Sequence, residues 1–246
     1  RIAWEARQRG LHAVGICDFD VLAGLDEFLA AADLLRLRGV VGFESRTFFS
    51  EYSDHEINSP GEPGVFYFMG VGFRDEPEES TPSGQVFASM LRQSHRRNRD
   101  LIERIDGHLN GLALDYEKDV LPLTPAGNAT ERHIVRAYRE KALEACGGDR
   151  SEAARFWATS LARTVDEVAG SMQDDNSFQN FLRSALMKKG GVGYVQPTEE
   201  TFPLLDNVID MILTCGAVPT TAWVDGTRSG ESDPQTQLEK KKKKGV

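Results

Sequence analysis

The sequence has few cysteines, no long apolar run and no excess of positive charge. Its three cysteines, Cys17, Cys146 and Cys215, lie far apart and form neither a C-x-x-C pair nor an even set for a disulfide framework. We expect reduced thiols, which favours a cytoplasmic protein. No apolar run approaches the roughly 18 residues that a membrane-spanning helix needs. The composition therefore predicts neither disulfides nor a membrane partner.

Positive charge is also scarce, since 29 Lys and Arg stand against 38 Asp and Glu, for a net charge of −9. A general nucleic-acid binder needs a basic surface to neutralise phosphates, so no nucleic-acid partner is expected. The chain also lacks the G-x-S-x-G, H-E-x-x-H and Walker patterns of serine hydrolases, zinc proteases and nucleotide-binding loops. Its 246 residues suit one domain of barrel size or two small ones.

The most informative segment is 10–49, where two short apolar stretches end in acidic residues. The first ends at Asp18 and Asp20 and the second at Glu44. The residues between them recur at helical spacing: Leu25, Phe28, Leu29, Ala32 and Leu35. A strand–helix–strand order predicts two parallel neighbouring strands, whose carboxyl ends meet at one edge. Because α/β folds build their sites at that edge, we expect the three acids to share one site.

The rest of the chain alternates segments of strand, helix and loop character. Residues 50–64 are rich in turn formers and predict a long loop. The expected elements are a strand over 65–73, a helix over 85–109, a short strand over 110–120, a helix over 131–145 capped by Thr130, polar helices over 148–190, a helix over 198–213 with Pro203 in its first turn, and a strand near 217–223. The five lysines near the end suit a solvated helix face, with a polybasic tail as the weaker alternative.

Two short motifs, Cys17-Asp18-Phe19-Asp20 and Gly42-Phe43-Glu44, resemble the polymerase and histidinol phosphatase (PHP) superfamily. That family has a strand ending Thr-Asp-His-Asp or Thr-Asp-His-Asn, a helix, and a strand ending Gly-Val-Glu or Gly-Ile-Glu. The resemblance covers most of the chain outside 148–190. It implies an α/β fold, a distorted (β/α)7 TIM-like barrel that holds up to three metal ions, and phosphoester hydrolysis in many members.

The resemblance also implies how the chain is divided and that it is incomplete. Residues 1–147 would form the first part of the barrel, 148–190 a helical insertion, and 191–246 a further part of the barrel. The family's His-x-His strand would precede Arg1, and its Asp-x-His motif would follow Val246. We therefore expect a fragment of a longer chain.

Three positions that hold histidine in the family are aromatic here. They are Phe19, Tyr67 in the segment Tyr67-Phe68-Met69-Gly70, and Trp223. Phe and Trp cannot coordinate a cation, and Tyr does so only after losing its phenolic proton. His133, in Thr130-Glu131-Arg132-His133-Ile134, is retained. We therefore expect a divalent metal (Mg, Mn or Zn) to be held weakly.

The resemblance implies a role for each retained residue. The metal ligands would be Asp18, Asp20 and Glu44, the catalytic residues these three with His133, and the substrate-binding residues Arg46 and Arg132. Taken alone, Asp18 or Asp20 is equally a helix cap, and His133 is more often a packed or surface histidine than a ligand.

Two functions stay open. One is a metal-dependent phosphoesterase of reduced or altered activity that acts on a small phosphorylated molecule. The other is a non-catalytic PHP-like scaffold whose aromatic pocket binds a small organic ligand or a protein partner.

Overall fold

The computed structural model describes residues 1–109 and 111–222, with residues 227, 233, 235, 238, 239 and 242 beyond them. The chain divides into two compact units: residues 1–93 with the described residues from 197 onward, and residues 94–196. The insertion expected over 148–190 lies inside the second unit, which begins earlier. Within the described ranges, no helix is long and apolar enough to cross a membrane.

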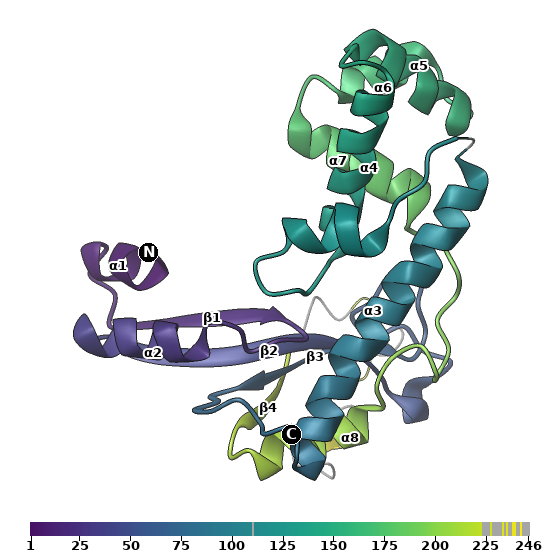
Figure 1. Ribbon diagram of the computed structural model, residues 1–246. Coiled ribbons are helices and arrows are strands. Elements are labelled where there is room, and N and C mark those ends of the chain that lie inside the picture. The colour runs from purple at the N-terminus through teal and green to yellow at the C-terminus, as the bar shows by residue number, and fades with distance from the viewer. Residues whose placement is uncertain are drawn as a thin grey trace. The chain divides into compact units, whose positions relative to one another are not determined.

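A four-stranded sheet forms the centre of the first unit (Figure 1). Its strands lie in the order β1 (Ala13–Phe19), β2 (Arg38–Phe48), β3 (Val65–Val71) and β4 (Val218–Thr221). Helix α2 (Leu25–Leu34) joins β1 to β2, and these two strands are parallel, as the sequence predicted. The β2–β3 and β3–β4 pairs are antiparallel.

The described strands therefore form a mixed sheet, and they do not confirm the barrel. The connection from β2 to β3 contains no crossover α-helix, which agrees with the antiparallel pairing. Residues 49–64 contain a 3₁₀ turn at Ser50–Tyr52 and no longer helix. A parallel return needs a crossover of about a dozen or more residues, usually including an α-helix.

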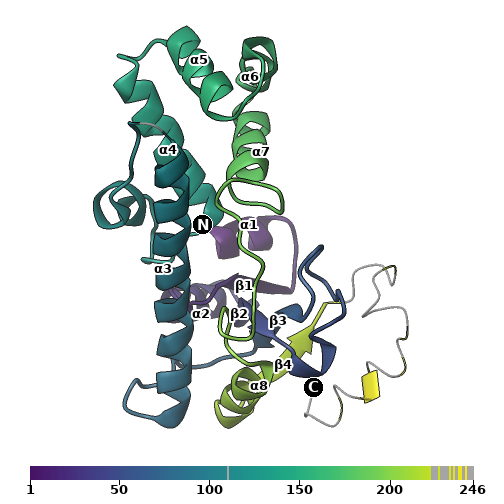
Figure 2. The same ribbon diagram turned by 90° about the vertical axis from the view of Figure 1, so that its right-hand side faces the viewer.

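One face of the sheet carries the apolar core of the first unit. Val41, Phe43, Phe66 and Phe68 alternate along β2 and β3 and are at most 1% exposed. They pack against α2, the first part of α3 (Pro82–His108) and α8 (Leu205–Thr214), as Figure 2 helps to follow. Strand alternation turns the intervening residues to the opposite face.

Small residues allow the helices of this unit to pack closely against the sheet and against one another. At Gly70 a Cβ atom would lie 2.8 Å from Cγ1 of Ile212 on α8. On the other side of the unit, α1 (Ile2–Gln8) buries Ala3 and Ala6 in a small cluster with Ala32 and Leu37. These contacts hold helices at both ends of the sheet.

All the described secondary-structure elements of the second unit are helical, joined by loops. It contains the later part of α3, then α4 (Glu131–Ala145), α5 (Arg150–Ser160), α6 (Val165–Ser171) and α7 (Asp175–Leu186), visible together in Figure 1. Ile134, Tyr138, Trp157 and Leu182 are at most 1% exposed in its core. Helices α5 to α7 agree with the helical character expected for 148–190, and α4 has the bounds expected from the Thr130 cap.

Two local predictions were wrong. The strand expected over 110–120 is absent from described residues 111–120, which instead hold a π-helical turn at Tyr116–Val120. The Asp115 carboxylate begins this turn by accepting the N–H groups of Glu117 and Lys118. Helix α8 begins at Leu205 rather than at Thr198, and Pro203 precedes it: the Pro203 carbonyl accepts the N–H of Phe48 at the end of β2. Trp223 and most of the lysine-rich end lie outside the described residues.

Candidate functional site

The carboxyl end of β1 lies beside the middle of β2, and this brings the predicted acids of the first unit near one another. The strand expected to end at Glu44 continues to Phe48. The parallel register pairs Asp18 with Phe43 and Phe19 with Glu44. The backbone N–H of Asp20 continues this pairing by donating to the carbonyl of Glu44 at 2.9 Å. Asp18, Asp20 and Glu44 therefore lie within a few residues of one another across adjacent strands.

Asp20 has a structural task where β1 ends. It has a left-handed backbone with a φ of 58°, which a short polar side chain tolerates better than most. Its carboxylate accepts a 2.5 Å hydrogen bond from Oγ of Ser45, and the residue is 7% exposed. This acid therefore holds the end of β1 against β2 and places a negative charge beside Glu44.

Glu44 has an altered acidity. Burial raises the pKa of its carboxyl, and the nearby charge of Asp20 raises it further. The pKa of the Cys17 thiol is also raised, first by burial and then by Glu44 and Asp18. Cys17 therefore stays a thiol rather than an activated nucleophile. Glu44 holds a proton to higher pH than an ordinary glutamate, which suits a group that exchanges protons.

Aromatic side chains lie on the same face of the sheet as Glu44. The rings of Phe19 and Tyr67 are 6.3 Å apart between centroids and inclined at 67°, in an edge-to-face arrangement. Phe19 is 40% exposed. Because Phe19 pairs with Glu44 and Tyr67 with Arg46, the face carries an aromatic pair beside an acid and a base.

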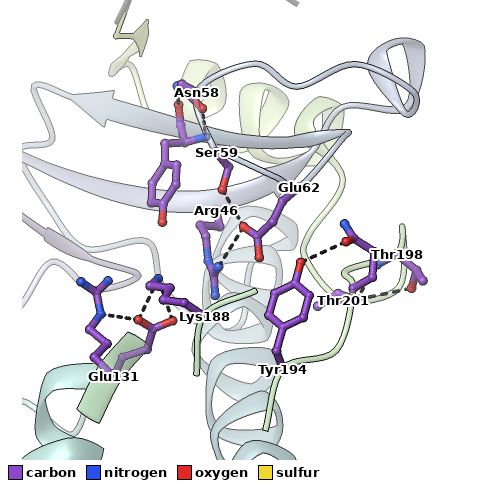
Figure 3. Close-up of polar contacts among 12 residues, drawn as sticks. Arg46, Asn58, Ser59, Glu62, Glu131, Lys188, Tyr194, Thr198 and Thr201 are labelled. Atoms are coloured by element: carbon purple, nitrogen blue, oxygen red, sulfur yellow. Dashed lines mark hydrogen bonds and ion pairs between the residues drawn. The ribbon is translucent and has the colours of Figure 1, made fainter. Parts of the chain in front are cut away.

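The loop predicted over 50–64 supplies an ion-pair partner for Arg46. Its guanidinium lies 4.4 Å from the centroid of the Phe202 ring, and Nη1 lies 3.4 Å from Oε2 of Glu62. The same oxygen of Glu62 accepts a 2.6 Å bond from Ser59, as Figure 3 shows. The positive charge of Arg46 is therefore balanced and its position is fixed.

The same loop is also tied to β3. The side-chain amide of Asn58, labelled in Figure 3, bonds the backbone of Tyr67 twice, accepting its N–H at 2.7 Å and donating to its carbonyl at 2.9 Å. Loop and strand therefore support one another beside the aromatic pair.

His133 and Arg132 belong to the second unit, so their grouping with Glu44 stays a prediction. Nδ1 of His133 accepts the backbone N–H of Thr130 at 3.0 Å and so caps the start of α4. Burial lowers the pKa of His133, and Arg136 lowers it further. Nη1 of Arg132 donates to Oε1 of Gln179 at 3.4 Å. A capping role is thus established for His133.

The described side chains do not fit a metal cluster. Among them there is no group of three or more His, Cys, Asp and Glu residues placed to hold a metal ion. The aromatic rings of Phe19 and Tyr67 occupy two positions that the resemblance assigns to imidazoles, and the carboxylate of Asp20 already accepts a bond from Ser45. The raised pKa of Glu44 also opposes the deprotonated form that a cation binds.

Sequence reasoning assigned no role to three residues of this site: Cys17, Ser45 and Glu62. Cys17 and Ser45 are next to predicted acids in the sequence, so the same pattern could have predicted their place on the strands. Glu62 gave no such signal. It lies in a Gly- and Pro-rich loop, and local sequence does not specify where such a loop packs.

No protein-family model and no curated protein matches this sequence. Solved structures do match. A candidate metal-dependent phosphoesterase from Bifidobacterium adolescentis has a TM-score of 0.59 and 20% identity, over 100% of this chain and 68% of that one. An amidohydrolase from Chromobacterium violaceum, with bound sulfate and no metal, has a TM-score of 0.56 and 16% identity, over 98% and 65%.

This likeness shows a shared α/β fold. The chain spans about two thirds of the length of both neighbours, 68% of one and 65% of the other.

Proposed function

We propose that this chain is a PHP-type hydrolase domain whose phosphoesterase activity is reduced or altered, and that its sheet is part of a distorted (β/α)7 barrel. The observation that carries the proposal is the setting of Glu44. This half-buried carboxyl, with a raised pKa, lies on β2 where the parallel strand β1 ends, near the charge of Asp20. Perturbed acids at such a strand end are typical of functional sites.

The proposed substrate is a small phosphorylated molecule. Glu44 would exchange a proton with a water molecule or leaving group, since burial first and the charge of Asp20 second raise its pKa. Arg46, fixed by Glu62 and Phe202, would orient the oxyanion. The sulfate of the Chromobacterium amidohydrolase supports an oxyanion as the ligand class.

Activity is expected to be low because donors are lost. The name of the Bifidobacterium protein suggests a divalent metal, yet the described donors do not fit a cluster. Phe19 and Tyr67 cannot replace two imidazoles, so the first consequence of the altered site is weak metal binding.

A phosphomonoester assay with p-nitrophenyl phosphate tests the proposal, on the full-length parent protein with Mg²⁺, Mn²⁺ or Zn²⁺ added. We expect slow turnover that Glu44→Gln abolishes. Glu27→Gln serves as the matched control, because Glu27 is an exposed glutamate on α2 of the same unit. Elemental analysis should find fewer than two metals per chain. Equal turnover in both variants would remove Glu44 from the reaction.

The contact between Phe19 and Tyr67 favours a second candidate, a non-catalytic scaffold. An exposed aromatic edge suits an organic ligand better than bare phosphate. In that case no turnover is expected, and p-nitrophenyl phosphate binding should survive Glu44→Gln but weaken in Phe19→Ala.

A further inference from the structure

The second unit contains a cavity of about 410 Å³, within the size range of small-molecule sites. Side chains of α4, α5 and α7 line it, together with Met172 just after α6. All of its lining residues lie between 136 and 179, so the cavity belongs wholly to this unit. It includes none of the residues proposed above for hydrolysis.

The lining carries more positive than negative charge. Three arginines contribute to it, against two acids. Arg136 bonds Glu140 at 2.7 Å, and Arg139 bonds Asp175 at 2.6 Å. Arg150 donates to the carbonyl oxygen of Met172 at 2.6 Å, which is a neutral acceptor. One guanidinium charge is therefore left without an acidic counterpart in the lining.

The two acids are poor competitors for an incoming anion. The Asp175 side chain is 81% exposed and that of Glu140 is 56% exposed, so water screens both ion pairs. Arg139, by contrast, is only 21% exposed. Its guanidinium lies 5.2 Å from the centroid of the Phe178 ring, which fixes its orientation. A fixed guanidinium presents a fork of N–H donors that matches a carboxylate or a phosphate.

The floor of the cavity is apolar and aromatic. Trp157 is 1% exposed and Phe178 is 4% exposed, and Ala153 lies beside them in the lining. Buried aromatic side chains offer a flat surface for another planar group. The cavity thus combines guanidinium donors with an apolar floor.

We infer that this cavity binds a small organic anion, in which a phosphate or carboxylate group is joined to a flat apolar body. The oxyanion meets the guanidinium groups of Arg150 and Arg139, while the body lies against the aromatic floor. Neither inorganic phosphate alone nor a neutral aromatic molecule satisfies both halves of the site.

Isothermal titration of the intact chain tests this with benzylphosphonate, which has no ester bond to hydrolyse. Phenylacetate serves as the carboxylate arm, and inorganic phosphate and benzyl alcohol as the two half-ligands. Benzylphosphonate or phenylacetate should bind at least about tenfold more tightly than either half-ligand, since a charge-assisted hydrogen bond alone is worth about that factor. The tighter of the two names the oxyanion. Equal affinity for benzyl alcohol would overturn the inference.

Variants on α5 localise the binding. Arg150→Gln should weaken it about tenfold, and Arg150→Lys, which keeps the charge but loses the fork, should fall between. Arg155→Gln is the matched control: Arg155 is an exposed arginine of the same helix, paired with Glu152, and it does not line the cavity. An equal loss in Arg150→Gln and Arg155→Gln would place the ligand elsewhere and overturn the assignment.

Discussion

Phe19 at the end of β1 and Tyr67 on β3 contact each other edge to face, with 6.3 Å between ring centroids. By resemblance to the PHP superfamily, both positions would hold metal-binding imidazoles. Here they form a ring pair of a kind worth about 0.5–1.5 kcal/mol beyond its buried area. An interaction between two aromatic rings therefore lies on the face of the sheet that carries Glu44.

Placing imidazoles at these two positions should create a metal site. In the double variant Phe19→His/Tyr67→His, the new nitrogens lie on the same face as the Glu44 carboxyl. We expect Zn²⁺ affinity to rise by on the order of tenfold or more, given that even outer partners of metal ligands change affinity by about 10–100-fold. Titration with Zn²⁺ at pH 7.5 measures this. Val40→His, an exposed position four residues before Glu44 on β2, should give no gain, and equal gains there would refute a built site.

Replacing Glu44 by glutamine should stabilise the fold at neutral pH. The folded pKa of Glu44 is raised, by burial first and by Asp20 second, so the folded state holds the proton more strongly than the unfolded chain. Stability is therefore lost as pH rises from about 4.3, the unfolded value, through the folded pKa. Glutamine does not titrate and avoids this loss.

Urea unfolding of Glu44→Gln and wild type at several pH values measures the effect. The two proteins should differ least below pH 4 and most at pH 7, with the variant more stable. Glu27→Gln on α2 should show no such divergence. A variant less stable than wild type at pH 7 would mean that Glu44 serves the fold rather than a site.

The sequence was informative where short-range patterns decide the structure. The apolar runs and helical spacing of residues 10–49 predicted β1, α2, β2 and their parallel pairing, because each signal is local and the connection restricts the topology. Thr130 likewise marked the start of α4.

Contacts made by loops that fold back onto the sheet could not be predicted in this way. Glu62 reaches Arg46 because the loop after β2 folds back over the sheet. Turn residues favour a chain reversal but do not specify which residues the loop then contacts. The capping of α4 by Nδ1 of His133 was also missed, because glutamate and glutamine are the usual partners at that position.

The pair of Arg46 and Glu62 should be more strongly coupled than an exposed pair. Their side chains are 24% and 13% exposed, whereas those of Arg136 and Glu140 are 53% and 56% exposed. A double-mutant cycle with Arg46→Met and Glu62→Gln should give a coupling of about 1–2 kcal/mol in urea unfolding. The same cycle at Arg136 and Glu140 should give about 0.3–0.5 kcal/mol. Equal couplings would show that the 3.4 Å contact adds nothing beyond surface attraction.

His133 should make the second unit sensitive to mild acid. Its Nδ1 accepts the N–H of Thr130, and a backbone N–H can only donate, so this nitrogen must be unprotonated in the folded state. The folded pKa is lowered, by burial first and by Arg136 second. The contribution of His133 to stability is therefore present above the unfolded pKa of about 6.5, and it is lost as pH falls through the folded value.

Glutamine at this position should keep the cap without the titration, because its side-chain oxygen accepts the same N–H in the usual capping box. We expect His133→Gln to match wild-type stability within about 0.5 kcal/mol at pH 8 and to exceed it at pH 5, since only the wild type then has to protonate the cap. Urea unfolding at the two pH values measures the difference. His12→Gln, at an exposed histidine before β1, should leave the pH dependence unchanged. If His133→Gln and wild type lose stability in parallel between pH 8 and pH 5, the histidine does not titrate at the cap, and the acid sensitivity arises from other groups.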